Sequence, residues 1–135
     1  MSPRLRRLVR NRARRRCEYC RLHENDLPLW SFHADHIVAE QHSGSDVPAN
    51  LAWACQRCNL FKGTNLTTID PQTGKLARVF NPRNQQWDKH FKIENTRIGG
   101  LTPTGRATAR LLQMNVEERT DLRAELAALG HWPPS

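Results

Sequence analysis

The sequence predicts an α+β fold for this chain of 135 residues. Two Cys-x-x-Cys pairs frame its first half, and the apolar runs between them have the length of short strands. Near both ends of the chain the apolar residues recur at helical spacing instead. Short strands beside helices are typical of an α+β protein, and this length suits one domain with an appendage.

The chain opens with a dense run of arginines. Ser2 and Pro3 resemble an N-cap followed by proline at the first helical position. The apolar residues that follow fall near helical spacing: Leu5, Leu8, Val9 and Ala13. We therefore expect residues 1–16 to form a basic arm or helix that lays arginines, Arg6 and Arg10 among them, along a phosphate backbone. A frayed basic tail is the alternative, and an arginine-rich transit peptide is a third reading.

Composition narrows the choice of partner and compartment. The formal net charge of +8 attracts polyanions, so nucleic acid is the leading partner, with a solvated basic face or an acidic protein as alternatives. No apolar run approaches the ~20 residues of a membrane span, and no apolar segment near the N-terminus resembles a signal peptide. All four cysteines lie in the two pairs, which favours a reducing cytoplasm over a disulfide-forming compartment.

The four cysteines predict a closed zinc site. Thiolates at positions i and i+3 of a tight turn can face one cation, and two such turns supply four ligands at about 2.3 Å. The expected ligands are Cys17, Cys20, Cys55 and Cys58. A site made only of thiolates leaves no position for water, so we expect this zinc to be structural. Reduced free thiols or a redox pair are the alternatives.

Acid, imidazole and amide side chains lie between the cysteine pairs. Asp35 and His36 are consecutive on an expected strand over residues 32–38, so their side chains point to opposite sides. A neutral imidazole can take a proton from water, and carboxylate and amide oxygens are hard ligands for a divalent cation. Together they suit hydrolysis of a phosphodiester bond, although each residue alone is more often structural.

These residues, in this order, resemble the HNH endonuclease family. The resemblance is carried by Asp35-His36-Ile37-Val38, Asn50-Leu51 and Cys55-x-x-Cys58-Asn59-x-x-Lys62-Gly63, preceded by Cys17-x-x-Cys20. It implies that residues 17–65 form a ββα-metal (His-Me finger) core, in which a hairpin packs on a helix around one catalytic divalent cation. Residues 66–135 would then be a C-terminal extension, of hairpin and helices, packed on that core.

The resemblance also implies a role for each residue of the motif. His36 would be the general base and Asn50 the middle asparagine, which can hold the loop by its amide. Asp35 and Asn59 would bind the catalytic cation, Mg²⁺, Mn²⁺ or another divalent ion. Asn59 stands where the name of the family expects histidine, so the chain looks like an HNN-type variant.

Further candidates surround this motif. Arg57 and Lys62 flank the metal-binding asparagine and are expected to contact phosphate, and His42 lies in a glycine-containing loop where it could touch the substrate. His33 shares the strand face of Asp35 and is expected to be a polar strand residue, with a third ligand or a phosphate contact as alternatives.

The extension contains its own turn and cap signals. Residues 70–74 predict a hairpin turn followed by a strand over residues 76–80. Gly99 and Gly100 predict another turn, Thr102 or Thr104 a helix cap, and Gly130 the end of a last helix.

The sequence thus predicts a metal-dependent endonuclease acting on DNA, most simply on a duplex. A non-catalytic zinc module that binds DNA or RNA would share the charge and the cysteines but would have no use for Asp35 and His36. An RNA-cleaving nuclease is a third reading that no residue excludes.

Overall fold

The computed structural model describes all of residues 1–135, and these divide into two compact units. Unit 1 comprises residues 1–66 and 81–84, and unit 2 comprises residues 67–80 and 85–135. Helices and short antiparallel hairpins occur in the chain, so the predicted α+β class is confirmed. No helix combines the length and the apolar character that crossing a bilayer demands.

Unit 1 begins with the predicted basic helix, α1 (Pro3–Arg12). The Ser2 hydroxyl accepts a hydrogen bond from the Leu5 amide at 3.1 Å, and Pro3 occupies the first turn, as the cap signal predicted. Val9 is the one buried residue of the helix. Helix α1 therefore lies on unit 1 by a narrow apolar face and contacts strands β1 and β2, which follow.

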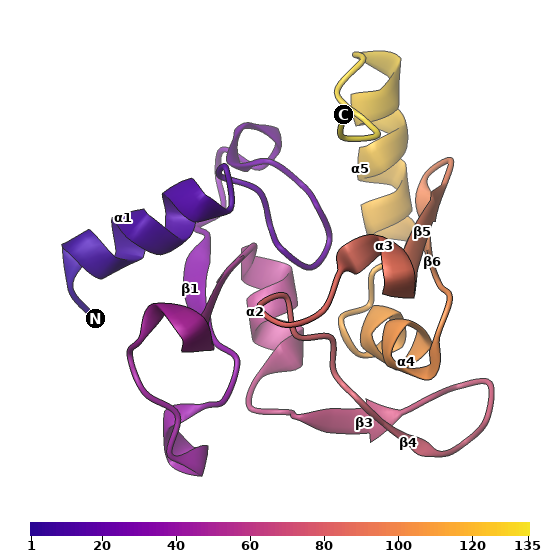
Figure 1. Ribbon diagram of the computed structural model, residues 1–135. Helices are drawn as coiled ribbons and strands as arrows, with labels where there is room; N and C mark the ends of the chain where they lie inside the picture. Colours follow the sequence, from indigo (N-terminus) through magenta and orange to yellow (C-terminus); the bar gives the residue numbers. More distant parts are fainter. The chain divides into compact units, whose positions relative to one another are not determined.

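A hairpin and a helix form the centre of unit 1 (Figure 1). Strand β1 (His33–His36) pairs antiparallel with β2 (Leu51–Ala54), and helix α2 (Gln56–Lys62) follows β2 directly and contacts β1. Short 3₁₀ turns lie at 24–26, 40–42 and 48–50. Every residue of β2 is buried, so this strand is covered on both faces, whereas only Asp35 of β1 is buried.

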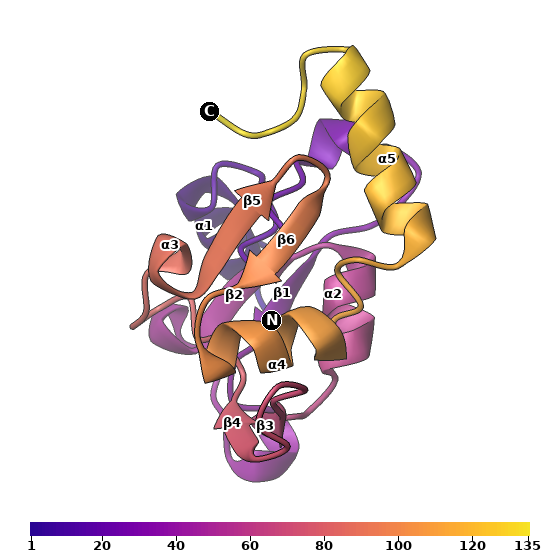
Figure 2. The same cartoon turned by 90° about the vertical axis from the view of Figure 1, so that its right-hand side faces the viewer.

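Unit 2 contains two hairpins and three helices. The strands are β3 (Thr67–Ile69), β4 (Leu76–Arg78), β5 (Phe91–Glu94) and β6 (Arg97–Gly100), and the helices are α3 (Trp87–His90), α4 (Pro103–Leu111) and α5 (Glu117–Ala128). Helix α4 contacts β3, β4 and β6, and Figure 2 shows it beside the end of the β5–β6 hairpin. It is therefore the element around which unit 2 is assembled.

Asp70 joins the first hairpin of unit 2 to α4. Its carboxylate accepts hydrogen bonds from the Gln72 amide and the Thr73 hydroxyl, which shape the predicted turn. It also receives a two-pronged pair from Arg106 of α4, at 3.0 and 2.8 Å. The Arg106 hydrogen bond holds the pKa of Asp70 well below its usual range. The carboxylate thus stays charged where it ties the hairpin to the helix.

The expected turn at Gly99-Gly100 is wrong. Both glycines belong to strand β6, and the chain reverses at Asn95, whose φ is 56°. A Cβ on Gly100 would lie 2.3 Å from the Arg106 nitrogen, whereas a Cβ on Gly99 would meet nothing closer than 3.8 Å. Gly100 therefore reflects the close approach of strand β6 and helix α4 rather than a turn.

Candidate functional site

The four cysteines converge on one point in unit 1. All are buried, and their sulfurs lie within 4.8 Å of one another. The sulfurs of Cys20 and Cys55 are 3.7 Å apart. A tetrahedron of thiolates about 2.3 Å from a central zinc has edges of about 3.8 Å, so the donor set fits this ion.

The backbone supports charge on these sulfurs. The Cys20 amide points at the Cys17 sulfur at 3.4 Å, and the Cys58 amide points at the Cys55 sulfur at 3.5 Å. Without a cation, burial raises the pKa of the Cys17 thiol well above its usual value. A buried cluster of thiolates therefore needs a metal, and the arrangement suggests a zinc site with no open position for water.

Asp35 lies inside unit 1, and both of its polar partners are buried with it. Its side chain is 5 % exposed, and it accepts hydrogen bonds from the Tyr19 hydroxyl at 3.0 Å and from the Lys62 ammonium at 3.1 Å. Burial raises the pKa of the Asp35 carboxyl, and Lys62 opposes that shift. The pair joins strand β1 to helix α2.

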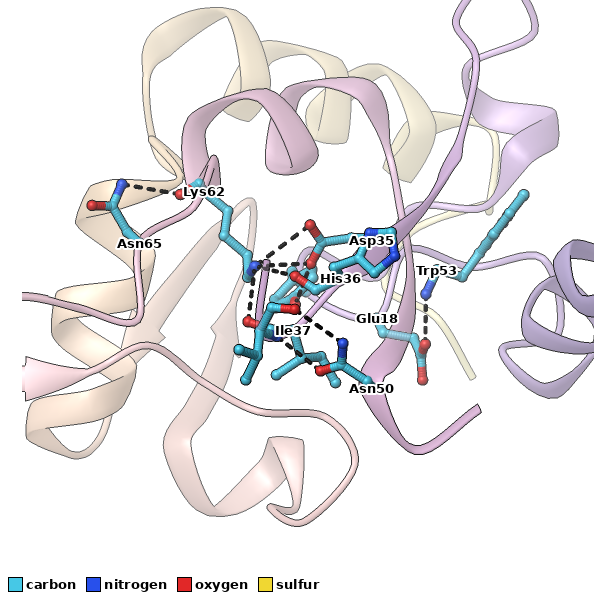
Figure 3. A network of polar contacts seen from close by, with 10 residues as sticks. Glu18, Asp35, His36, Ile37, Asn50, Trp53, Lys62 and Asn65 are labelled. Carbon is cyan, nitrogen blue, oxygen red and sulfur yellow. Dashed lines mark hydrogen bonds and ion pairs between the residues drawn. The ribbon is translucent and has the colours of Figure 1, made fainter. Parts of the chain in front are cut away.

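Lys62 sits in a pocket of oxygen atoms (Figure 3). Its side chain is 2 % exposed, and besides Asp35 its ammonium donates to the carbonyls of His36 at 3.0 Å and Ile37 at 3.5 Å. This burial does not suit the phosphate contact expected from the sequence. The sequence does not indicate that Lys62 is buried. Its only related signal is that Lys62 follows Asn59 by three residues, which puts both on one face of α2.

The oxygen atoms around Lys62 are also suitable ligands for a divalent cation. A carboxylate and two carbonyls already surround a positive charge, and hard oxygen donors are the ligands that Mg²⁺ and Mn²⁺ prefer. The Lys62 ammonium therefore marks a place where this fold stabilises a cation. Asn59 is half-buried on α2, on the side of the helix that carries Lys62.

His36 is half-buried and has other partners than the buried Asp35, in keeping with the alternation of consecutive strand residues. Its Nε2 atom lies 2.5 Å from a carboxylate oxygen of Asp46 and 3.7 Å from one of Glu40. The hydrogen bond to His36 lowers the pKa of Asp46. In the tautomer of the neutral imidazole that carries its proton on Nε2, Asp46 accepts that proton in a hydrogen bond and the lone pair lies on Nδ1.

Sequence reasoning missed both Asp46 and Glu40. Residues 43–46 contain the serines and glycine of a turn, and nothing in their spacing indicates that Asp46 reaches back to the imidazole. With His36 these acids form a second group of possible ligands, whose donor atoms lie within 4.8 Å of one another. Both acids are exposed, so the group alone does not define a metal site.

Asn50 closes the loop between the strands. Its amide oxygen accepts a hydrogen bond from the Val38 amide at 2.9 Å, and its amide nitrogen donates to the carbonyls of Val38 at 3.0 Å and Ser45 at 2.9 Å. These three bonds hold both ends of the segment that carries Asp46. Asn50 therefore acts on the loop rather than on a ligand.

The remaining candidates are scattered. His42 is exposed at the end of a 3₁₀ turn, Arg57 is half-buried on α2, and His33 is half-buried at the start of β1.

Neither Arg6 nor Arg10 projects freely. Arg6 donates to the Phe32 carbonyl at 3.0 Å, and its guanidinium lies 4.8 Å from the centre of the Trp53 ring. Arg10 forms a two-pronged pair with Glu24, at 2.8 and 2.9 Å.

Comparison with known proteins gives one match. The family model described as HNH endonuclease matches residues 17–65, the segment that runs from Cys17 past helix α2. Neither the curated proteins nor the solved structures contain a match to the chain.

Proposed function

We propose that this chain, which belongs to the HNH endonuclease family through residues 17–65, hydrolyses phosphodiester bonds of double-stranded DNA. One observation carries the proposal beyond the family match. His36 stands on one side of strand β1 with an exposed carboxylate holding its Nε2, while Asp35 faces a cation on the other side. This arrangement puts a proton acceptor, His36, and a charge-stabilising carboxylate, Asp35, on consecutive residues of one strand.

His36 acts in this proposal as the general base. Asp46 holds the Nε2 proton, so Nδ1 takes a proton from the water that attacks the phosphorus. Asn50 keeps the loop that carries Asp46 in register with the strand, and it is a positioning residue. The proton acceptor thus has a fixed tautomer before substrate binds.

Asp35 and Asn59 would hold the catalytic divalent cation, Mg²⁺ or Mn²⁺. When bound, such an ion neutralises charge on the scissile phosphate and on the leaving 3′-oxygen, so the products carry 5′-phosphate and 3′-hydroxyl ends. Lys62 already supplies one positive charge to Asp35. Its ammonium has to share or leave that carboxylate when the ion binds. The four cysteines would hold zinc as a structural ion only.

A plasmid assay tests the proposal. His36→Ala should abolish nicking of supercoiled DNA in the presence of Mg²⁺ or Mn²⁺, while zinc content and circular dichroism stay unchanged. His131→Ala is the matched control, because that histidine is exposed in unit 2, outside the proposed centre, and it should retain cleavage. Full nicking by His36→Ala would refute the role of the imidazole.

A non-catalytic zinc module that binds nucleic acid is the second candidate. The observation that favours it is the Lys62–Asp35 pair, which already satisfies the carboxylate without a metal. Under this alternative the wild-type protein binds a duplex but cleaves neither DNA nor RNA with any added divalent ion. Cleavage of RNA alone would keep the mechanism and change the substrate.

A further inference from the structure

The eight arginines of residues 4–16 divide into two sets. One set is bonded within unit 1: Arg6 and Arg10 as described, Arg12 to the carbonyls of Pro48 and Leu51, and Arg16 to the carbonyl of Arg21. The shortest of the Arg12 contacts is 2.6 Å. These four guanidiniums fasten the N-terminal segment to the hairpin and to the first zinc knuckle.

The second set makes no such bonds. The side chains of Arg4, Arg7, Arg14 and Arg15 are exposed and have no hydrogen bond or ion pair within the chain. Guanidiniums that stabilise no part of the fold remain free to bind an external anion. Composition does not separate this set from the bonded one, since the arginines of both sets are interspersed within the same segment, residues 4–16.

Two of the free arginines, Arg4 and Arg7, lie on one side of helix α1. Arg4 and Arg7 are three residues apart and Asn11 continues the same stripe, whereas the buried Val9 lies on the opposite side of α1. The turn that follows adds Arg14 and Arg15. Arg4 and Arg7 thus lie on the side of α1 that faces away from its buried residue, Val9.

Arg14 and Arg15 are held in an unfavourable backbone conformation. Their φ angles are 55° and 60°, in the left-handed region that costs about 1 kcal/mol or more for each residue with a side chain. The Arg15 amide donates to the Arg10 carbonyl at 3.1 Å, and the Arg15 carbonyl accepts from the Glu24 amide at 3.0 Å. The zinc ligand Cys17 follows two residues later. The turn is therefore rigid, and it displays two guanidiniums that the fold does not use.

The dimensions suit a nucleic-acid backbone. A helix rises about 1.5 Å per residue, so the segment from Arg4 to Arg14 extends for about 15 Å. One strand of a duplex carries a phosphate about every 3.4 Å of its axis, so this length passes about four phosphates. Guanidiniums pair with phosphate oxygens in two-pronged fashion, and four of them on a fixed frame lose little entropy on binding.

We propose that Arg4, Arg7, Arg14 and Arg15, which precede the HNH segment, form a phosphate-binding ridge. This ridge binds the sugar–phosphate backbone of the DNA duplex. The inference deepens the proposed function, on which it rests for the identity of the polyanion, but it requires no cleavage. Arg6, Arg10, Arg12 and Arg16 hold the ridge in place and do not contact the DNA.

Binding of a labelled duplex tests the ridge without catalysis. The measurement uses the full chain carrying His36→Ala, with no added divalent ion, and compares affinities over a range of salt concentrations. In the ridge variant, Arg4, Arg7, Arg14 and Arg15 are all changed to Gln. The control variant changes four exposed cations of unit 2 to Gln: Lys75, Lys89, Arg97 and Arg110. Each variant loses four charges, so both fall from a formal net charge of +8 to +4.

The slope of log affinity against log salt should fall by about 3.6 in the ridge variant, since each of the four lost phosphate contacts contributes about 0.9. Its affinity at physiological salt should fall by about 10-fold or more. The control variant should keep most of its slope. Equal losses in the two variants would overturn the ridge, because net charge alone would then account for binding.

Two further outcomes separate the possible errors. An unchanged slope in the ridge variant, together with lost binding to vesicles of phosphatidylserine, would assign the surface to a membrane and overturn the proposal. Failure of the proposed function would appear differently, as tight ridge-dependent binding by a wild-type protein that never cleaves. Zinc content and circular dichroism, measured on every variant, exclude misfolding as the cause of a lost slope.

Discussion

The Lys62–Asp35 pair is the most consequential contact at the scale of single residues. Only 2 % of Lys62 and 5 % of Asp35 is exposed, so neither charge can be solvated by water when its partner is removed. We expect Lys62→Met to destabilise unit 1 by about 3–5 kcal/mol, because it leaves a buried carboxylate uncompensated. Native-state hydrogen exchange of the amides of β1 and α2 measures this on unit 1 alone.

A double variant provides the control for that prediction. Asp35→Asn combined with Lys62→Met removes both charges, so it should be more stable than Lys62→Met alone. A Lys62→Met protein that matched the wild type within about 0.5 kcal/mol would show that the pair contributes nothing to the fold. The two residues would then need another reason for their burial.

Residues of the site were predictable from the sequence to very different degrees. The sequence alone predicted that Asp35 and His36 lie on opposite sides of their strand, because the alternation of strand side chains depends only on local geometry. The partners of these residues, Lys62 and Asp46, lie 27 and 10 residues further along the chain. Contacts across such distances depend on loop closure, which local spacing does not encode. The roles in catalysis assigned to this set stay predictions.

Among the elements, strand β6 and helix α4 approach each other so closely at residue 100 that only glycine fits there. A Cβ on Gly100 would stand 2.3 Å from a backbone nitrogen of α4, which no side-chain rotation can relieve. Gly100→Ala should therefore destabilise unit 2 by about 1–3 kcal/mol or more. Exchange protection of the α4 and β6 amides measures the loss.

Gly99→Ala is the matched control, since its Cβ would meet only ordinary contacts at 3.8 Å. It should lie within about 0.5 kcal/mol of the wild type. Equal destabilisation by the two substitutions would mean that backbone freedom, rather than the close approach of the helix, explains the glycines.

Capped helices were the most predictable elements, and paired glycines were the least. Ser2-Pro3 at α1 and Thr102-Pro103 at α4 both proved to be the caps that the sequence indicated, because a cap acts within three residues. Helix α2 begins at Gln56, where the Cys55 sulfur accepts the Cys58 amide, so a member of the four-cysteine cluster is also the cap of the helix. Gly99-Gly100 misled because glycine permits close packing as readily as a turn.

At the scale of the whole molecule, the chain contains two compact units of which only one holds the cysteine cluster. The segment 81–84 returns to unit 1, where Arg83 pairs with Glu18 beside the first cysteine knuckle. Composition gave no sign of this return, because the pairing depends on a single arginine. Unit 2 has a core of its own, in which Phe80, Trp87 and Phe91 pack ring against ring at 5.2 and 5.0 Å.

This division predicts how the protein responds to loss of zinc. Because a thiolate site is absent from the unfolded chain, the free energy of zinc binding is part of the folding free energy of unit 1. A zinc chelator should therefore remove exchange protection from residues 1–66 and 81–84, while the amides of β5, β6 and α4 stay protected. Returning zinc should restore the pattern, and Cys58→Ser should reproduce it without chelator. Protection that survived in both units would exclude a folding role for the metal, and protection lost evenly from both would show that the two units fold as one.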